Sequence, residues 1–334
     1  MQKRILGDTD LELSVIGLGT WAIGGGDWAF GWGDQDDQKA VAAILKSVEL
    51  GVNWIDTAAV YGLGKSEQLV GKALAEIPVT DRPLIATKCG RTNLGEGKIG
   101  KSLRRESVIA ECEQSLQNLN VDCIDLYQIH WPEPDEEIEE GWQTLVDLKQ
   151  QGKVRHIGVS NHSVDQLKRL QAIHPVASLQ PPYSMLARDV ESEILPFCGA
   201  NKIGVVCYSP MGKGLLTGSF NAQRAKALSD NDHRSRDPRF QSPQLEINLT
   251  FVESLGKIAE DLGWTIPELA IAWVMRRPEV TSAIVGSRSP KQIEQTVVAG
   301  TRTLDQSSVD AIESHLKILE DSLASLSGIE KARV

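Results

Sequence analysis

The sequence lacks the features that would place it in a membrane, outside the cell or on nucleic acid. No apolar stretch reaches the roughly 18 to 20 residues that a membrane span needs, and no apolar segment follows the basic residues near Met1, as a secretory signal would require. The 35 Lys and Arg residues are outnumbered by 45 Asp and Glu residues, and the resulting formal charge of −10 repels a polyanion. We therefore expect a cytoplasmic protein whose partner is a small molecule, and we leave its oligomeric state open.

Cysteine and histidine are also scarce, and this argues against disulfides and metal sites. The five cysteines are odd in number and form no CxxC pair, which is typical of reduced thiols packed as small apolar residues. None of the six histidines has a neighbouring His or carboxylate at a metal-binding spacing on a strand end. We expect no metal, and a metal-dependent barrel hydrolase is disfavoured.

What the sequence does contain is a series of short apolar runs that alternate with amphipathic stretches. Mostly continuous apolar runs are typical of parallel strands that are buried on both faces. The predicted strands are Val15–Leu18, Asn53–Asp56, Leu84–Lys88, Cys123–Ile129, Val154–Val159, Ala177–Leu179, Ile203–Val206 and Ser282–Val285. The predicted helices between them are Gln38–Leu50, Ser66–Leu74, Arg105–Leu119, Glu136–Gln151, Val164–Ile173 and Val190–Ala200. Eight strands with intervening helices predict an α/β fold, a (β/α)8 TIM barrel that forms a single domain over residues 1–334.

Two segments depart from this alternation. Lys3–Leu6 and Leu11–Leu13, around Gly7 and Asp8, predict an N-terminal β-hairpin before the first barrel strand. After the seventh strand, Met211 to about Leu249 is rich in Gly, Ser, Asn, Arg and Pro and shows little periodicity. We expect a long loop there that acts as a lid or a binding segment.

Four polar side chains follow successive predicted strands, at the end of a barrel where enzymes build their sites. Asp56 ends the second strand and Tyr61 follows in the loop, Lys88 ends the third strand, and His130 follows the fourth. Each one alone is more often structural than catalytic, but together they would converge on one opening.

The chemistry of these four residues fits the reduction of a carbonyl group. Hydride that arrives at a carbonyl carbon leaves negative charge on the oxygen, which needs a proton donor and fixed hydrogen bonds. A free tyrosine has a pKa of about 10, so we expect Lys88 to lower the pKa of Tyr61 while Asp56 holds the ammonium in place. His130 would orient the carbonyl and polarise its oxygen.

The chain resembles the aldo-keto reductase superfamily over nearly its whole length, and is most similar to bacterial members related to general stress proteins and inositol-operon reductases. The motifs that carry the resemblance are Gly17–Trp21, Ile55–Ala58 with Tyr61–Gly62, Thr87–Lys88, Asp125–Trp131, Ile157–Asn161, Gln180–Tyr183, Tyr208–Pro210 and Val285–Arg288. The resemblance implies that Tyr61 is the general acid, that Asp56 and Lys88 tune it, and that His130 positions the substrate. It also implies NADP(H) as cofactor and an aldehyde or ketone as substrate.

The cofactor prediction combines an absence with the resemblance. Gly17-Leu18-Gly19 and Gly62-Leu63-Gly64 both lack the third glycine of GxGxxG, so a Rossmann dehydrogenase is disfavoured. In the family the cofactor lies across the barrel mouth, with Ser160, Asn161 and Gln180 on the nicotinamide amide and Tyr208 stacked on its ring. The full predicted set of cofactor contacts is Thr20, Trp21, Asp56, Ser160, Asn161, Gln180, Tyr208, Ser209, Pro210, Met211, Gly212, Lys213, Gly214, Arg234, Gly286, Ser287, Arg288 and Gln292.

Within this set, we expect the glycines and Lys213 of the long loop to bind the pyrophosphate. Arg288 and Gln292, after the eighth strand, are predicted to contact the ribose 2′-phosphate, with Arg234 as a second clamp. Two alternatives stay open here: Ser160 and Asn161 could cap a helix, and Arg234 could be a solvated surface residue. The chain departs from the family at Gln295 and Thr296, where Glu-Asn often contacts the adenine.

Tryptophans complete the predicted mouth. Trp21, Trp28 and Trp131 would line the substrate pocket as aromatic walls, although a barrel core also buries tryptophan. An alternative function is an NADP(H)-binding regulatory subunit that resembles potassium-channel β-subunits, which share the architecture. The chain keeps every catalytic group, so we expect the enzyme rather than this alternative.

Overall fold

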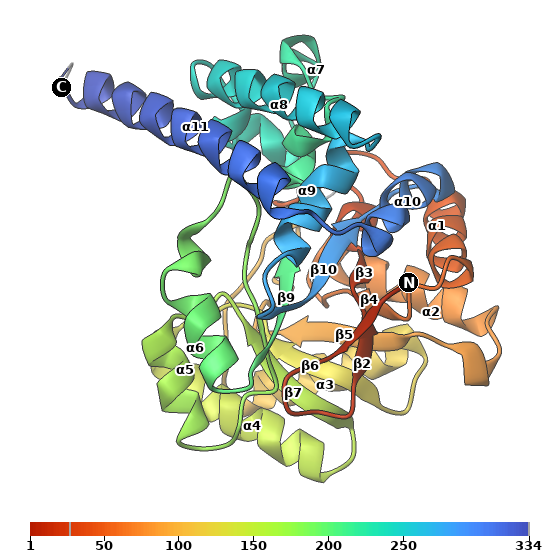
Figure 1. Cartoon of the computed structure of the whole chain (residues 1–334). Coiled ribbons are helices and arrows are strands. Elements are labelled where there is room, and N and C mark those ends of the chain that lie inside the picture. Colours follow the sequence, from red (N-terminus) through yellow and green to blue (C-terminus); the bar gives the residue numbers. More distant parts are fainter. Residues whose placement is uncertain (27, 333–334) are drawn as a thin grey trace.

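The structure is a computed structural model that describes residues 1–26 and 28–332. In this part of the chain eight parallel strands close into a barrel, in the order β10-β3-β4-β5-β6-β7-β8-β9 (Figure 1). The strands are β3 (Ile16–Gly19), β4 (Trp54–Asp56), β5 (Leu84–Cys89), β6 (Ile124–Ile129), β7 (Val154–Ser160), β8 (Ser178–Gln180), β9 (Gly204–Tyr208) and β10 (Val280–Gly286). Each predicted strand is present and differs at its ends by a few residues, so the predicted TIM barrel is confirmed.

The N-terminal hairpin covers the amino-terminal end of the barrel. Strands β1 (Lys3–Ile5) and β2 (Glu12–Ser14) pair antiparallel, as predicted. The hairpin residues Leu6, Leu11 and Leu13 are buried against apolar side chains of the barrel strands, among them Trp54. Because this end is filled with apolar side chains, a polar ligand has access only to the opposite, carboxyl-terminal end.

Helices surround the barrel and fix the loops of that opposite end. The α-helices are α1 (Asp37–Glu49), α2 (Lys65–Ala75), α3 (Arg105–Leu119), α4 (Ile138–Gln150), α5 (Val164–Gln171), α6 (Ile194–Ala200), α7 (Ala222–Lys226), α8 (Gln244–Asp261), α9 (Ile266–Met275), α10 (Pro290–Val297) and α11 (Gln306–Ala332). Helix α11 packs along α8, and its C-terminal part projects beyond the barrel (Figure 1). None of the described helices combines the length and the apolar character that crossing a bilayer requires.

The long segment after β9 is more ordered than predicted. It contains the 3-10 helices η6 (Gly212–Thr217), η7 (His233–Arg236) and η8 (Pro238–Phe240) together with α7, and α8 already begins at Gln244 rather than after Leu249. The predicted end of the loop is therefore wrong, because buried Leu245 already belongs to the apolar face of α8. Helices α4 and α6 also begin later than predicted, after the 3-10 turns η4 (Asp135–Glu137) and η5 (Asp189–Glu191).

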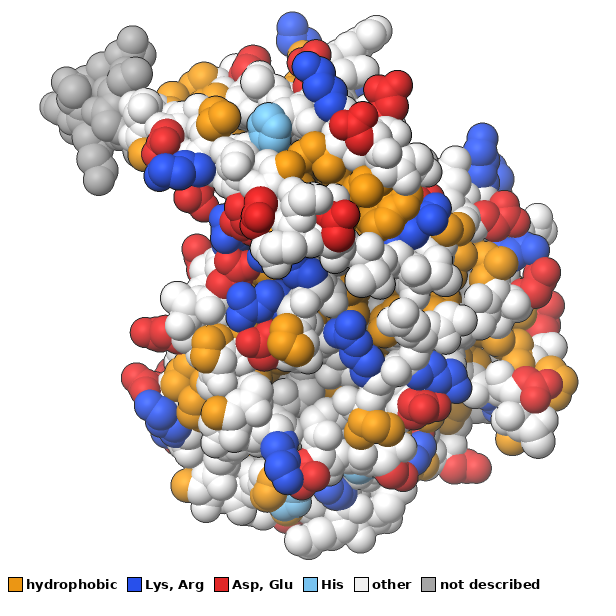
Figure 2. Space-filling model, in the orientation of Figure 1, with side chains coloured by type: hydrophobic (Ala, Val, Ile, Leu, Met, Phe, Trp, Pro, Cys, Tyr) orange, Lys and Arg blue, Asp and Glu red, His pale blue; other side chains and the backbone are white. Residues whose placement is uncertain are grey.

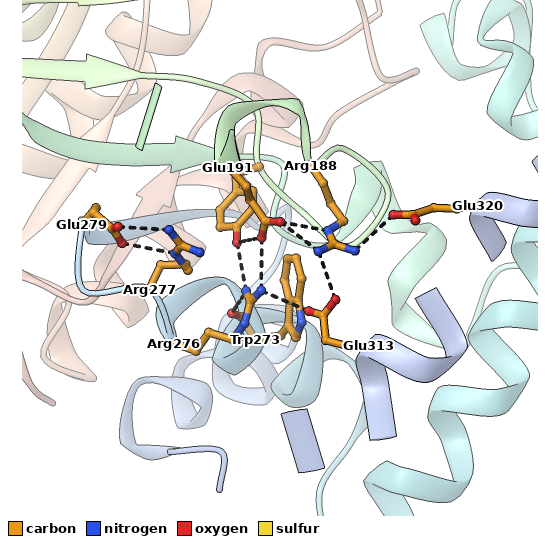
Figure 3. A network of polar contacts seen from close by, with 9 residues as sticks. Arg188, Glu191, Trp273, Arg276, Arg277, Glu279, Glu313 and Glu320 are labelled. Atoms are coloured by element: carbon orange, nitrogen blue, oxygen red, sulfur yellow. Dashed lines mark hydrogen bonds and ion pairs between the residues drawn. The ribbon is translucent and has the colours of Figure 1, made fainter. Parts of the chain in front are cut away.

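A network of ion pairs joins the segment after β8 to helices α9 and α11 (Figure 3). Arg276 lies 3.7 Å from the ring centre of Trp273 and donates hydrogen bonds to the Tyr183 hydroxyl (2.9 Å), Glu191 (3.1 Å) and Glu313 (3.2 Å). Three elements far apart in the sequence are thus fixed by one guanidinium.

Elsewhere on the face shown in Figure 2, acidic and basic side chains are interspersed.

Candidate active site

The four predicted catalytic residues meet at the carboxyl-terminal end of the barrel. Asp56 is the last residue of β4, Lys88 lies near the end of β5, and His130 directly follows β6. Tyr61 opens the 3-10 turn η2 (Tyr61–Gly64) that follows β4. The ring centres of Tyr61 and His130 are 5.6 Å apart, and Lys88 Nζ lies 5.2 Å from the centre of the Tyr61 ring.

Lys88 and Asp56 form a buried ion pair beneath Tyr61. Lys88 Nζ donates to both carboxylate oxygens of Asp56 at 2.8 Å and to the carbonyl oxygen of Thr57 at 2.8 Å. A second donor, Gln180 Nε2, reaches Asp56 from the opposite wall of the barrel at 2.7 Å. Burial raises the pKa of Asp56 and lowers that of Lys88, while their mutual attraction opposes both shifts.

The pKa of Tyr61 shifts in the direction opposite to the predicted one. Burial first, and then the negative charge of Asp56, raise this pKa well above its usual value of 10.0. The predicted lowering by Lys88 is not found, because Asp56 neutralises the ammonium. Tyr61 therefore remains a neutral phenol over the physiological pH range, and a neutral phenol is the protonated form that a proton donor requires.

His130 is held as a neutral imidazole. Burial, followed by the positive charges of Lys88 and Arg91, lowers its pKa well below 6.5. Its Nδ1 is buried and has no hydrogen-bond partner among the described residues. A neutral imidazole beside the Tyr61 ring can donate one hydrogen bond to a substrate oxygen without competing as the proton source.

The three residues predicted to hold the nicotinamide amide form one hydrogen-bonded group with the catalytic residues. Ser160 Oγ donates to the carbonyl oxygen of Gln180 at 2.7 Å, and Asn161 Nδ2 donates to Ser160 Oγ (2.9 Å) and to the carbonyl oxygen of His130 (3.0 Å). The Tyr208 hydroxyl donates to Asn161 Oδ1 at 2.9 Å. Both Nδ2 hydrogens of Asn161 are used, so a ligand amide could reach this side chain only through Oδ1.

The helix-capping alternative for Ser160 and Asn161 is wrong. Ser163 caps α5 instead: its hydroxyl accepts from the backbone N–H of Gln166, whose side chain accepts from the backbone N–H of Ser163. This capping box leaves Ser160 and Asn161 in the loop at the barrel mouth. The predicted contact Thr20 is turned inward, because its hydroxyl donates to the carbonyl oxygen of Asp56 at 3.0 Å.

The predicted phosphate-binding corner gathers several cations from distant segments. Arg234 is buried and pairs with Asp232 at 2.6 Å, so the surface alternative for Arg234 is wrong. Lys213 pairs with Asp237 at 3.1 Å, and Arg234 Nη1 donates to the carbonyl oxygen of Lys213 at 3.4 Å. Burial lowers the pKa of Arg288, and the positive charge of Arg234 lowers it further. The two guanidinium groups are therefore within electrostatic reach of each other.

Arg288 links this corner to the loop after β3. Its guanidinium donates to the Gln35 side chain (2.6 Å) and to the carbonyl oxygens of Trp32 (3.0 Å) and Asp34. Its backbone N–H donates to Gln292 Oε1 at 2.7 Å. Among the described residues, three of the five guanidinium N–H groups are thus engaged, which leaves two for a ligand.

The backbone around these cations leaves room for a phosphate. Ser209, Gly212, Lys213 and Gly214 have positive φ angles, so the chain turns tightly here, and the N–H groups of Gly212 and Gly214 donate to the carbonyl oxygens of Ser209 (2.9 Å) and Met211 (3.0 Å) within these turns. A side chain added at Gly286 would meet no atom within 4 Å. Pro210 and Met211 lie between these turns, and the Ser287 hydroxyl donates to the carbonyl oxygen of Ser289 at 2.9 Å. The donors and open backbone fit a phosphorylated dinucleotide.

Two of the three predicted pocket tryptophans lie beside Tyr61. Trp21 stacks on Tyr61 (6.2 Å between ring centres) and on His233 (4.8 Å), and Trp28 lies 6.1 Å from Tyr61. Trp28 is almost fully buried, whereas Trp131 is 38 % exposed and its ring contacts Arg91 instead. The structure therefore places Trp21 and Trp28 in one aromatic wall and Trp131 apart from it.

Comparisons with known proteins agree with this geometry. The profile of the Aldo/keto reductase family matches residues 15–317. The chain belongs to the aldo/keto reductase family. It is 36 % identical over 295 residues to the aldo-keto reductase YhdN of Bacillus subtilis, covering 88 % of this chain and 87 % of that protein. It is 34 % identical over 332 residues to the NADH-specific methylglyoxal reductase of Escherichia coli, covering 96 % of this chain and 100 % of that protein.

Solved structures of aldo-keto reductases share the fold. The glycerol dehydrogenase AKR11B4 of Gluconobacter oxydans superposes with a TM-score of 0.84 at 37 % identity, covering 94 % of each chain. The aldo-keto reductase AKR11C1 of Bacillus halodurans, in its holo form, gives 0.78 at 27 % identity and covers 94 % of this chain and 96 % of that one. The protein is thus an aldo-keto reductase, a carbonyl-reducing enzyme of a family for which a nicotinamide cofactor is typical.

Some residues at the mouth of this aldo-keto reductase were not predicted from the sequence. Asp232 and Gln35 hold the two arginines of the phosphate corner, and Arg91 stands beside His130 and Trp131. Arg91 could have been found, since it follows β5 just as Tyr61 follows β4. Asp232 and Gln35 carry no such signal, because their partners are recognisable only in the folded chain.

Proposed function

We propose that the protein reduces small aldehydes and ketones to alcohols with NADPH, and that Tyr61 donates the proton. The observation that carries the proposal is a buried, neutral Tyr61 that lies beside neutral His130 and above the Lys88–Asp56 pair. We also propose that residues 1–334 form one domain, of which Asp27 and the last two residues lie outside the described part. We further propose that the chain is related to general-stress and inositol-operon reductases.

Each residue has a separate task in this proposal. His130 donates a hydrogen bond that fixes the carbonyl oxygen, and Tyr61 gives its hydroxyl proton to that oxygen as negative charge develops. The Lys88–Asp56 pair forms the floor of the site beneath Tyr61. The bound nicotinamide would supply the hydride.

The cofactor would be held by the loops already described. Ser160, Asn161 and Gln180 would contact the nicotinamide amide, and Tyr208 would stack on its ring. Lys213 and Arg234 would face the pyrophosphate, and the two free N–H groups of Arg288 would bind a ribose 2′-phosphate, which only NADP(H) carries. Gln292 holds the backbone of Arg288 in place.

Turnover of a Tyr61→Phe variant tests the proton donor. We expect kcat for reduction of a simple aldehyde to fall at least about 100-fold, equivalent to about 2.7 kcal/mol in the barrier. NADPH binding, measured by fluorescence titration, should stay close to the parent value because the ring still packs. NADPH oxidation would be followed against aldehydes, ketones and sugars.

Tyr127→Phe is the matched control. Tyr127 is also buried, but it packs beside Cys89 in the apolar core, so removal of its hydroxyl should leave turnover unchanged. A Tyr61→Phe variant that kept its rate within about tenfold of the parent, a barrier change of only about 1.4 kcal/mol, would remove Tyr61 from the acid role.

A further inference from the structure

One cation at the barrel mouth is only partly used by the contacts that hold it. Arg91 lies two residues beyond the end of β5, and its side chain is only 12 % exposed. Its Nη2 donates to Glu133 Oε2 at 2.8 Å, whereas Nη1 is buried and has no hydrogen-bond partner in the described part of the chain. A buried charged donor without an acceptor is costly and rare in folded proteins, and it indicates a ligand that completes it.

The guanidinium is fixed in position by its surroundings. Glu111 accepts hydrogen bonds from the backbone N–H groups of Gly90 (3.0 Å) and Arg91 (3.3 Å), and thereby orders the turn. The Trp131 ring lies over the guanidinium, at 5.8 Å from the ring centre. A fixed donor loses little entropy when it binds a ligand.

The charges around Arg91 leave it net positive. Glu133 Oε2 is shared between Arg91 and Lys101, whose Nζ lies 2.7 Å away, so two cations share one carboxylate. Burial raises the pKa of the other nearby carboxyl group, Glu111, to about 7, and this shift favours its neutral form. The local excess of positive charge favours an anionic ligand group.

Arg91 is also close to the reacting centre. The positive charge of Arg91 helps to hold the pKa of His130 below its usual range. Burial and the charge of Lys88 contribute more to this lowering. His130 is the residue that would position the substrate oxygen, and Trp131 follows it directly in the chain. A substrate positioned by His130 is therefore within electrostatic reach of the Arg91 charge.

We propose that Arg91 Nη1 binds a carboxylate of the substrate, so that the enzyme prefers carbonyl compounds that carry a carboxylate over their uncharged counterparts. This proposal rests on the proposed carbonyl reduction. Trp131, which is 38 % exposed, is the side chain that moves aside to admit the carboxylate. Arg91 is then a specificity residue, and it takes no part in proton transfer.

Matched substrate pairs test the proposal. We would measure kcat/KM with NADPH for succinic semialdehyde against butanal, and for 4-carboxybenzaldehyde against benzaldehyde. In Arg91→Met, kcat/KM for the carboxylated member of at least one pair should fall about 10- to 100-fold, mainly through a higher KM. The reason is that a charge-assisted hydrogen bond is removed from the ground state and the transition state alike. The uncharged members should change less than about threefold. Succinate should inhibit butanal reduction by the parent, with an inhibition constant at least about tenfold higher in the variant.

Lys101→Met is the control, because Lys101 shares the same Glu133 oxygen but is 58 % exposed. It should keep the preference for carboxylated substrates. An equal loss for both members of each pair would show that Arg91 only supports the fold, and an unchanged preference in Arg91→Met would also overturn the proposal. If the parent enzyme reduced butanal and benzaldehyde as well as their carboxylated counterparts, this proposal would be overturned and the proposed function would remain intact. A parent that reduces none of these aldehydes would instead overturn the proposed function.

Discussion

Replacement of Lys88 by methionine would separate the structural role of the buried ion pair from its catalytic role. The side chains of Lys88 and Asp56 are 0 % and 4 % exposed, and the ammonium contacts both carboxylate oxygens at 2.8 Å. Methionine keeps most of the stem but leaves Asp56 with Gln180 as its remaining side-chain donor. Removal of one partner from a buried pair costs about 3 to 5 kcal/mol, because the other charge stays buried and uncompensated. We expect a loss of this size in the free energy of unfolding at pH 7, together with loss of turnover.

The loss should depend on pH in a defined direction. Burial already raises the pKa of Asp56, and removal of the opposing Lys88 charge raises it further. A carboxyl group whose pKa is higher in the folded state than the unfolded value of about 3.9 destabilises the fold when ionised. The penalty is therefore fully present above the folded pKa and disappears as the pH falls toward the unfolded value. The stability gap between the parent and Lys88→Met should narrow in acid.

The double variant Lys88→Met/Asp56→Asn provides the decisive comparison. An amide carries no charge, so the double variant should recover most of the lost stability at pH 7 while remaining inactive. Urea unfolding of the parent, the single variant and the double variant from pH 7 to pH 5 measures this directly. If the double variant is as unstable as the single one at neutral pH, the cost does not come from an unpaired carboxylate. Loss of packing or of the bond to Thr57 would then explain it.

Three further changes test other parts of the structure. Arg288→Ala should weaken NADPH about 10- to 100-fold and barely affect NADH in fluorescence titrations; an equal loss for both cofactors would assign Arg288 to the fold or the pyrophosphate. Gly62→Ala should lower the melting temperature and the turnover together, because Gly62 has φ +58° and a Cβ there would collide with the carbonyl oxygen of Gly24; a fully active, equally stable variant would contradict this. Arg276→Met should lower the free energy of unfolding in urea by about 1 to 3 kcal/mol, because it leaves Glu191 without one of its partners. Its kcat/KM should stay within about threefold of the parent value. Loss of activity without loss of stability would show instead that the network reaches the active site.

Much of the barrel could be predicted from the sequence because its strands are buried on both faces. Continuous apolar runs such as Ile203–Val206 have no polar side to satisfy, so they are visible without knowledge of their neighbours. Parallel strands connected by helices place all their carboxyl ends on one side of the barrel. For that reason Asp56, Lys88 and His130, each at a strand end, could be predicted to converge before any contact was known.

The sequence says less about segments whose order depends on distant partners. The region after β9 reads as an irregular loop, yet Arg234 is buried there by its pairing with Asp232 and its contact with Trp32, about 200 residues earlier. The first turn of α8 was missed for a related reason, since Leu245 is buried against the phenylalanines Phe220 and Phe240 of the preceding loop. Such tertiary contacts override weak local propensity.

The sequence by itself determined which residue types stand at the barrel mouth, because strand length and the alternation of elements fix their positions along the chain. Only the tertiary structure decided their charge states and their partners. Lys88 was expected to lower the pKa of Tyr61, but the folded chain pairs Lys88 with Asp56 and buries the phenol, so the pKa rises instead. The physical reason is that desolvation and pairing depend on distances of a few ångströms between segments that are distant in the sequence, and these distances exist only once the barrel has closed.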